Sequence, residues 1–254
     1  MVANEKEVVA IVATYNEGER LRPVLESLSK CELILDIVVV DDGSKDPPLW
    51  ASDFPKVRLF RHDKNVGKGA AMETGVRATD ATYIFFCDAD LVGFLPEHAV
   101  AIIKPVISGE YRTFLGLREN KEQQAVLLFA LNSGERCLYR SDWETLPRFY
   151  KKGFRVETGL NFFTKKRGEK FGYALLPYRQ TLKERKYGMR EGIKERWRMI
   201  YEVGTAYLRI IFYDFLRQDA KTTSSINQNL EKVLVELALF HVVKLLTFGL
   251  KFCG

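Results

Sequence analysis

The chain has 254 residues, 46% of them hydrophobic and 28% charged, which excludes wholesale disorder and fits one large α/β domain or a catalytic domain with an appendage. The net charge of +6 is unevenly distributed: residues 1–120 hold 14 Lys and Arg against 19 Asp and Glu, whereas residues 121–254 hold 25 against 14. Residues 148–198 alone carry 16 basic and 5 acidic side chains, which indicates that the two halves bind different ligands or surfaces.

The first 120 residues alternate strand-like and helix-like segments. Four short apolar runs are predicted to be strands: Val8–Ala13, Leu33–Val40, Val57–Arg61 and Thr82–Cys87. Helical spacing covers three other segments: Glu17–Leu28, Lys68–Ala78 and Pro96–Ile107. Three of the four runs are almost continuously apolar, as strands are when helices cover both faces of a parallel sheet. The alternation therefore predicts an α/β fold with an open, doubly wound and mostly parallel sheet.

From about Lys121 helical patterns dominate, and two long helices are expected to close the chain. In the first, apolar residues recur at three- or four-residue steps and predict a helical stripe of Ile193, Trp197, Ile200, Gly204, Tyr207, Ile211 and Phe215. The second covers Val233–Phe252, which is long enough to span a bilayer. Spanning would bury Glu236 and Lys244 at a cost of roughly 2.5–3.5 kcal/mol each. We therefore expect this helix to lie in a membrane interface or to pack on another protein surface.

The positions of the cysteines and histidines argue against a zinc site. The four cysteines show no CxxC spacing and the three histidines are scattered, so no zinc cluster is expected. Cys87 lies inside an apolar run, and no signal-peptide pattern precedes it. These observations favour a reducing, cytoplasmic location.

Acidic residues follow three of the predicted strands. Five carboxylates stand at these strand ends: Glu17, Asp41, Asp42, Asp88 and Asp90. Since ligands of open parallel sheets bind at the carboxyl ends of the strands, we expect these side chains to converge on one edge. So many acids stay ionised together only with a cation or a donor-rich ligand. Oxygen ligands without histidine suit Mg²⁺ or Mn²⁺, ions that usually bridge to phosphate oxygens.

Four motifs, taken in order, resemble one known family. They are TYNEGE at 14–19, VVVDDGS at 38–44, NVGKGAAMETG at 65–75 and FFCDADL at 85–91. Each motif is weak alone, but the ordered set is similar to the family 2 nucleotide-sugar glycosyltransferases with the GT-A fold. The resemblance implies a GT-A type sheet with a helical C-terminal extension. It also implies metal-dependent, inverting transfer of a sugar from a nucleoside diphosphate donor.

The resemblance further assigns residues to the donor side. The residues expected to bind the nucleotide sugar are Thr14, Asn16, Glu17, Asp41, Asp42, Lys68, Asp88 and Ala89. Among them, Glu17 and the Asp41/Asp42 pair would hold the ribose and base, and Lys68 would lie beside the nucleotide.

Asp88 and Asp90 would form the metal-binding DxD motif, and the resemblance also implies that Asp90 is a catalytic residue. A divalent ion held there would stabilise the departing diphosphate as a Lewis acid.

Three motifs of the second half are similar to those of polyprenyl- and dolichyl-phosphate sugar transferases and related bacterial and archaeal enzymes: Gly116-Leu117-Arg118, Ser133–Arg136 and Gly153–Thr158. In that group, arginines at positions like Arg118 and Arg136 bind the acceptor phosphate. A phosphate acceptor is already ionised, so it needs positioning and charge neutralisation more than a base. An alcohol acceptor, such as a glycan hydroxyl, would need a general base, for which Glu157 and Asp142 are the candidates.

One departure concerns the residues after the DxD. Leu91-Val92-Gly93 stands where polyprenyl-phosphate mannosyltransferases commonly carry Leu-Gln-His-Pro, so Val92 cannot complete a metal shell as that glutamine would. The predicted organisation is a catalytic domain at 1–190 and an amphipathic helical region at 191–254. Within the catalytic domain, 1–120 is the nucleotide-sugar-binding half and 121–190 the acceptor half.

Two other functions match parts of the sequence. FFCDADLV fits the hhhhDxDxV pattern of haloacid-dehalogenase-type phosphatases, but the further acidic pair that this family needs downstream is missing. The other hypothesis is a non-catalytic, glycosyltransferase-like scaffold that binds a partner through its last helix.

The basic segment at 148–198 can be a solvated surface, a nucleic-acid site or a contact with anionic membrane or lipid phosphate. No nucleic-acid recognition fold accompanies the segment, whereas each basic residue near anionic lipid adds roughly 1 kcal/mol of attraction. We therefore expect no nucleic-acid partner and a peripheral place on the cytoplasmic membrane face, with a homo-oligomer left open.

Overall fold

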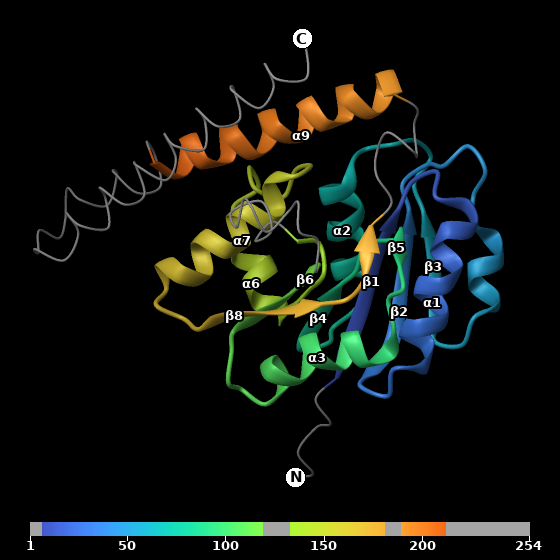
Figure 1. The fold of residues 1–254 in the computed structure, drawn as a ribbon, viewed down its shortest axis with the longest axis horizontal. Coiled ribbons are helices and arrows are strands. Elements are labelled where there is room, and N and C mark those ends of the chain that lie inside the picture. The colour runs from blue at the N-terminus through green and yellow to red at the C-terminus, as the bar shows by residue number, and fades with distance from the viewer. Residues whose placement is uncertain (1–6, 119–132, 181–188, 212–254) are drawn as a thin grey trace, which may run out of the picture.

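The structure is a computed structural model, and it describes residues 7–118, 133–180 and 189–211. A seven-stranded sheet forms the centre of the described part (Figure 1). Its strands are β1 (Val8–Thr14), β2 (Ile34–Asp41), β3 (Val57–Arg61), β4 (Tyr83–Phe86), β6 (Thr113–Arg118), β7 (Arg136–Tyr139) and β8 (Phe171–Leu176). A separate two-stranded ribbon pairs β5 (Leu91–Val92) with β9 (Arg179–Gln180).

Helices connect these strands. They are α1 (Leu21–Lys30), α2 (Lys68–Arg77), α3 (Pro96–Ile107), α6 (Arg140–Thr145), α7 (Arg155–Lys166) and α9 (Met189–Arg209), with two 3₁₀ turns at Gly18–Arg20 and Leu49–Asp53. In α1 the buried apolar residues Leu21, Val24, Leu25 and Leu28 follow the spacing of one helical face. α3 begins with Pro96, whose fixed φ angle suits the first helical position.

The sheet has the order β3-β2-β1-β4-β7-β6-β8. β1 pairs in parallel with β2 and β4, and β6 pairs in parallel with β8. β7 runs antiparallel to both of its neighbours, so it is the one reversed strand of this sheet among the described residues. The sheet is therefore mostly parallel, and the carboxyl ends of its other strands share one edge.

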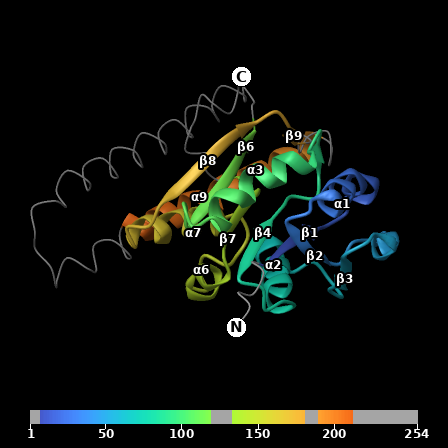
Figure 2. The same cartoon turned by 90° about the horizontal axis from the view of Figure 1, so that it is seen from below.

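Two layers of helices bury the two faces of the sheet (Figure 2). One apolar cluster joins alternate residues of β1 and β2 to α1 and α3. The other joins the opposite faces of these strands to α2, α6, α7 and α9. Because both faces are covered, β1, β4 and most of β2 are apolar, which is why they could be predicted from the sequence.

The predicted elements of the first half are confirmed to within a few residues, and the mixed α/β fold with a mostly parallel sheet is confirmed as well. After Lys121, α6, α7 and α9 hold more of the described residues than the strands do, as expected, but β7 and β8 were not predicted and extend the sheet there. Both strands are short, and a short apolar run in a sequence does not distinguish a strand from part of a buried helix.

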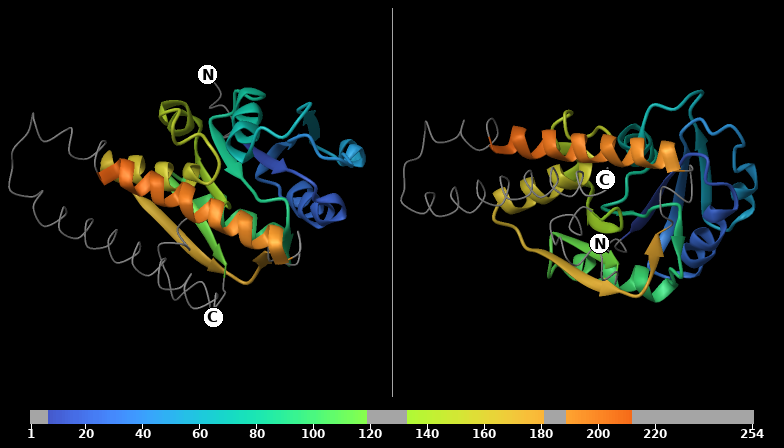
Figure 3. Two further views of the ribbon diagram at one scale, coloured as in Figure 1. Left: turned by 90° about the horizontal axis from the view of Figure 1, so that it is seen from above. Right: turned by 45° about the horizontal axis from the view of Figure 1, so that its top comes forward.

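α9 is the predicted first long helix, and it lies along α7 (Figure 3). The side that it buries differs from the predicted stripe: Val203, Ala206 and Ile210 enter the core, whereas Trp197 is 46% exposed. Only some of the apolar residues of α9 therefore pack against the rest of the described structure. The predicted helix at Val233–Phe252 lies outside the described residues, and the domain division at 190 remains a prediction.

Candidate active site

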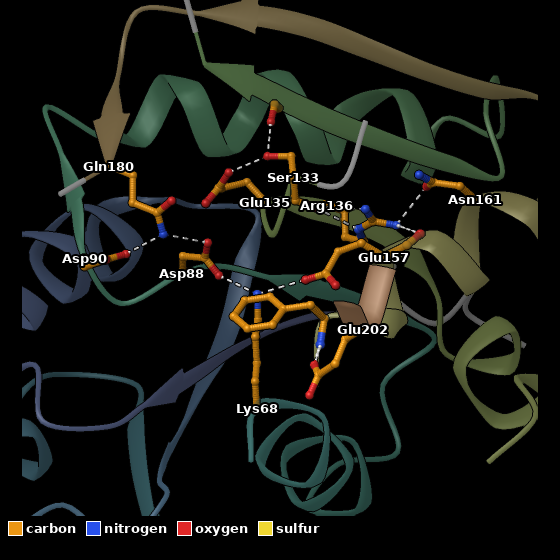
Figure 4. A network of polar contacts seen from close by, with 12 residues as sticks. Lys68, Asp88, Asp90, Ser133, Glu135, Arg136, Glu157, Asn161, Gln180 and Glu202 are labelled. Carbon is orange, nitrogen blue, oxygen red and sulfur yellow. Dashed lines mark hydrogen bonds and ion pairs between the residues drawn. The ribbon is translucent and has the colours of Figure 1, made fainter. Parts of the chain in front are cut away.

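Charged side chains gather at the edge where the parallel strands end (Figure 4). β4 ends two residues before Asp88, and β6 ends at Arg118. Because β7 is antiparallel, its first residue, Arg136, lies at this same edge, opposite Leu115 of β6. Residues from both halves of the chain therefore meet in one cluster.

Asp88 and Asp90 are joined by one amide group. The ribbon places Gln180 directly opposite Leu91, the residue after Asp90. Nε2 of Gln180 lies 3.2 Å from Oδ2 of Asp88 and 2.8 Å from Oδ1 of Asp90, and it donates to both. The Oε1 atom of Gln180 accepts a hydrogen bond of 2.6 Å from Arg118. The side chain of Gln180 therefore bridges the predicted metal ligands and the predicted acceptor arginine.

Lys68 approaches Asp88 from another direction. It is the first residue of α2, after Gly67, whose φ of 101° lies in the region that favours glycine. Its Nζ atom lies 2.9 Å from Oδ1 of Asp88 and 2.9 Å from Oε1 of Glu157. One ammonium group thus neutralises a carboxylate of the predicted donor side and one of the predicted acceptor side.

Arg118 lies between two carboxylates. Its Nη2 atom is 2.9 Å from Oε1 of Glu135 and 3.1 Å from Oδ2 of Asp88. Glu135 is fully buried and also accepts hydrogen bonds from the hydroxyl groups of Ser133 and Tyr178. These contacts fix the guanidinium of Arg118 beside the DxD motif.

The charges in this cluster shift the pKa values of its members in opposite directions. Burial by itself raises the pKa of Asp88, but the charges of Lys68 and Arg118 outweigh it and lower the value to about 2. Burial and the charge of Asp88 raise the pKa of Asp90 to about 6. Burial also raises the pKa of Glu135. Additional positive charge beside Asp88 would therefore stabilise the ionised form of Asp90.

This donor set fits a hard divalent cation. Asp88 and Asp90 could supply carboxylate oxygens, while the amide nitrogen of Gln180 holds these two carboxylates together. Among residues 7–118, 133–180 and 189–211, no group of three or more His, Cys, Asp or Glu side chains is placed to hold an ion. Two carboxylates completed by an amide, water or phosphate oxygens are nevertheless a common environment for Mg²⁺.

The predicted nucleotide residues Asp41 and Asp42 are both buried at the end of β2. Oδ1 of Asp41 accepts the amide of Ser44, while its Oδ2 atom is buried without a hydrogen-bond partner. Asp42 accepts the amides of Val66 and Gly67 at 3.0 and 2.7 Å. Asp42 therefore orders the loop that leads into Lys68. Oδ2 of Asp41 lies 3.5 Å from Nε of Arg61, and because it accepts no hydrogen bond, it is the atom that a ligand hydroxyl or base N–H would satisfy.

The other predicted donor residues surround this strand end. Asn16 has a positive φ of 55° and accepts the amide of Lys45 with its side chain. Thr14 and Ala89 are buried, at the end of β1 and inside the DxD respectively. Glu17 pairs with Arg20 at 3.0 Å.

The predicted acceptor residues differ in accessibility. Arg136 is 1% exposed, donates twice to the carbonyl of Ser133 and donates once to Asn161 at 3.0 Å. Burial lowers the pKa of Arg136 to about 10. Glu157 lies in the first turn of α7, and its Oε2 atom is buried without a hydrogen-bond partner. Arg118, Arg136 and Glu157 are thus brought to one edge, with Arg136 as the buried support.

Asp142, the alternative general base, lies elsewhere. It pairs at 2.8 Å with Arg112 and at 2.8 Å with Arg167. Arg112 precedes β6 and Arg118 ends it, so six strand residues, or roughly 17–20 Å, separate the two sites. Asp142 is therefore not brought together with the other candidates.

Sequence reasoning missed Gln180, and it treated Glu135 only as part of a motif. No local pattern marks Gln180, because its role depends on pairing between two segments that are 90 positions apart. The one sequence signal was Val92: because the glutamine expected after the DxD is absent there, an amide from another segment could take its place.

Comparison with known proteins agrees with this geometry. The sequence model of the family described as Glycosyl transferase family 2 matches residues 9–167, which is more than half of the chain. The chain belongs to this family. The predicted family is thereby confirmed, and this membership argues against the phosphatase hypothesis. A non-catalytic scaffold of the same family is distinguished from an enzyme by the donor-binding experiment given below. Gln180 and α9 lie outside the matched range.

Curated relatives are similar over part of their length. A dolichyl-phosphate β-glucosyltransferase of Trichomonas vaginalis is 34% identical over 94 residues, which cover 32% of this chain and 28% of the relative. The human dolichyl-phosphate β-glucosyltransferase is 36% identical over 111 residues, covering 36% of this chain and 33% of the relative. The chain thus spans about a third of the length of these two enzymes.

Solved structures support the fold. Glucosyl-3-phosphoglycerate synthase from Mycobacterium tuberculosis, in complex with Mn²⁺, UDP-glucose and phosphoglyceric acid, has a TM-score of 0.65. At 20% identity the match covers 79% of this chain and 79% of that one. In the described part of the chain, no helix combines the length and apolar character needed to cross a membrane.

Proposed function

We propose that this chain is a metal-dependent, inverting glycosyltransferase that moves a hexosyl group from a nucleoside diphosphate sugar to a polyprenyl phosphate. The observation that carries the proposal is the cluster in which Asp88, Asp90 and Gln180 meet Lys68 and Arg118 at the ligand edge of the sheet. Mg²⁺ or Mn²⁺ would be held by Asp88 and Asp90 and would stabilise the negative charge of the departing diphosphate.

The residues of the chain would divide the remaining work. Asp41 would accept hydrogen bonds from the nucleoside through Oδ2, which accepts none in the structure. Lys68 would hold positive charge beside the diphosphate as the anomeric C–O bond breaks. Arg118, supported by Glu135, would orient the acceptor phosphate, whose ionised oxygen forms the new bond to the sugar without giving up a proton. Attack from the face opposite the leaving group would invert the anomeric centre.

A lipid-phosphate acceptor is supported by the dolichyl-phosphate relatives and by the surface of α9. That helix exposes Trp197, Tyr201 and Leu208, and its first ten residues belong to the basic segment at 148–198. Exposed aromatic residues beside basic ones suit an anionic membrane interface. We propose that 1–190 forms the catalytic domain and that 191–254 attaches it to the cytoplasmic membrane face.

One observation favours a second candidate, an alcohol acceptor. The buried Oε2 atom of Glu157 has no hydrogen-bond partner, and a hydroxyl group bound there would satisfy it. Glu157 would then take the proton of the attacking hydroxyl. Replacement by Gln separates the two candidates, because loss of a general base lowers the rate roughly 10²- to 10⁴-fold, whereas transfer to phosphate would change far less.

The test begins with calorimetry of UDP- and GDP-sugars in the presence and absence of Mn²⁺. Transfer to short polyprenyl phosphates and to sugar alcohols would follow, with the anomeric configuration of the product read by NMR. Metal-dependent donor binding with an inverted lipid-linked product is expected. Equal donor affinity with and without Mn²⁺, or a product with retained anomeric configuration, would contradict the proposal.

A further inference from the structure

Helix α9 contacts the turn that precedes α7 through one carboxylate. Oε2 of Glu202 accepts a hydrogen bond of 2.8 Å from the backbone N–H of Phe154. Phe154 is the N-cap of α7 and makes no side-chain capping bond itself. Since free amides give a helix N-terminus a partial positive charge, Glu202 caps α7 from a neighbouring helix (Figure 4).

The carboxylate of Glu202 lies close to the backbone of Gly153. Gly153 has a φ of 57°, and a Cβ atom there would overlap the carboxylate of Glu202. A second polar contact follows, in which Arg155 donates to the hydroxyl of Thr205 at 3.3 Å. Beside these polar contacts, α7 and α9 pack together in one apolar cluster, which includes Val156, Leu160, Ala206 and Ile210.

The other side of the same turn rests on α2. A Cβ atom on Gly69 would overlap the carbonyl oxygen of Lys151, so the turn packs against the first turn of α2 beside Lys68. Glu157 follows one helical turn later and meets Lys68 at 2.9 Å. The turn that sets the distance between Lys68 and Glu157 is therefore held between α2 and α9.

We propose that Glu202 is a positioning residue that couples α9 to the Lys68–Glu157 pair. When Glu202 caps α7, the first turn of that helix and Glu157 are fixed relative to α2. When the cap is lost, the turn loosens, and Glu157 no longer holds the ammonium group of Lys68 in place beside Asp88. The proposal rests on the proposed function, because it takes Lys68 to act on the diphosphate of the donor.

Two substitutions remove the contact from opposite sides. Glu202→Ala deletes the carboxylate, and Gly153→Ala pushes it away. Both are expected to raise hydrogen–deuterium exchange in two separate peptides, one containing residues 150–160 and one containing residues 65–72. Both should also lower kcat about tenfold or more, with the donor KM within about twofold of wild type, since a small displacement of reacting groups reduces the rate without removing donor contacts.

Two further variants serve as controls for the contact between Glu202 and Phe154. Glu202→Gln keeps the shape and an acceptor oxygen for the Phe154 amide, so it should restore most of the rate. Glu202 also pairs with Arg198 at 3.2 Å within α9. Glu144→Ala removes a comparable helical pair, with Arg140 at 3.0 Å, and should leave exchange in both peptides and kcat unchanged.

Unchanged exchange in the 65–72 peptide of Glu202→Ala would overturn the proposal, as would a loss of rate that merely follows the folded fraction. If the wild-type chain transfers no sugar, the proposed function fails on its own, while exchange at the 65–72 peptide still decides whether α9 is coupled to Lys68.

Discussion

The Nζ atom of Lys68 lies 2.9 Å from Oε1 of Glu157, although 89 positions separate the two residues in the chain. Lys68 begins α2 and Glu157 lies in the first turn of α7, so the pair joins two helix N-termini at the ligand edge of the sheet. Helix N-termini attract anions. This pair therefore marks the place where a diphosphate and an acceptor would meet.

Replacement of Lys68 by Ala is expected to leave Asp88 and Glu157 without a shared cation. The free energy of unfolding should fall by roughly 1–3 kcal/mol, because buried acceptors lose their donor, and the transfer rate should fall roughly 10²-fold. Lys68→Arg, which keeps the charge, is the control. A double-mutant cycle with Glu157→Gln should give a coupling energy above about 0.5 kcal/mol. Additive effects of the two substitutions would show that the contact between Lys68 and Glu157 does not contribute to stability.

Replacement of Gln180 by Ala should weaken Mn²⁺ binding about 10- to 100-fold, the range found when a group supporting metal ligands is lost. Titration of Mn²⁺ followed by electron paramagnetic resonance, with UDP present, measures this directly. Val92→Ala is the matched control, since Val92 lies in the same ribbon and is 57% exposed. Equal affinities in the two variants would remove Gln180 from the metal environment.

Replacement of Asp90 by Ala should abolish both donor hydrolysis and sugar transfer, because one of the two proposed metal carboxylates is lost. Chelation of metal from the wild-type chain should have the same effect, and added Mn²⁺ or Mg²⁺ should reverse only the chelation. Full activity of the variant in a transfer assay would refute the metal assignment of the DxD motif.

Replacement of Asp142 by Ala should affect stability and not chemistry. The Asp142 side chain is 4% exposed and links Arg112 to Arg167, so its loss should cost roughly 1–3 kcal/mol. For a chain of this size, thermal unfolding should shift by about 2–4 °C per kcal/mol. The transfer rate per folded molecule should stay at the wild-type level, and a fall of 10²-fold would restore Asp142 as a candidate base.

Local patterns in the sequence determined the first half of the protein. The strands at β1, β2 and β4 are apolar on both faces because helices cover both, and the acids directly after them could reach only the ligand edge of a parallel sheet. The positions of Asp88, Asp90 and Lys68 followed from such neighbours in sequence. β6, β7 and β8 were not predicted, because a short apolar run does not distinguish a strand from part of a buried helix.

The tertiary structure decided which residues act together. The pairing of β5 with β9 brings Gln180 to the DxD, and the reversed strand β7 brings Glu135 to Arg118. The length of β6 removes Asp142 from the site, and the packing of α9 on α7 brings Glu202 to Phe154. Each of these relationships depends on strand register or helix packing between distant segments, and a sequence read locally carries no information on either.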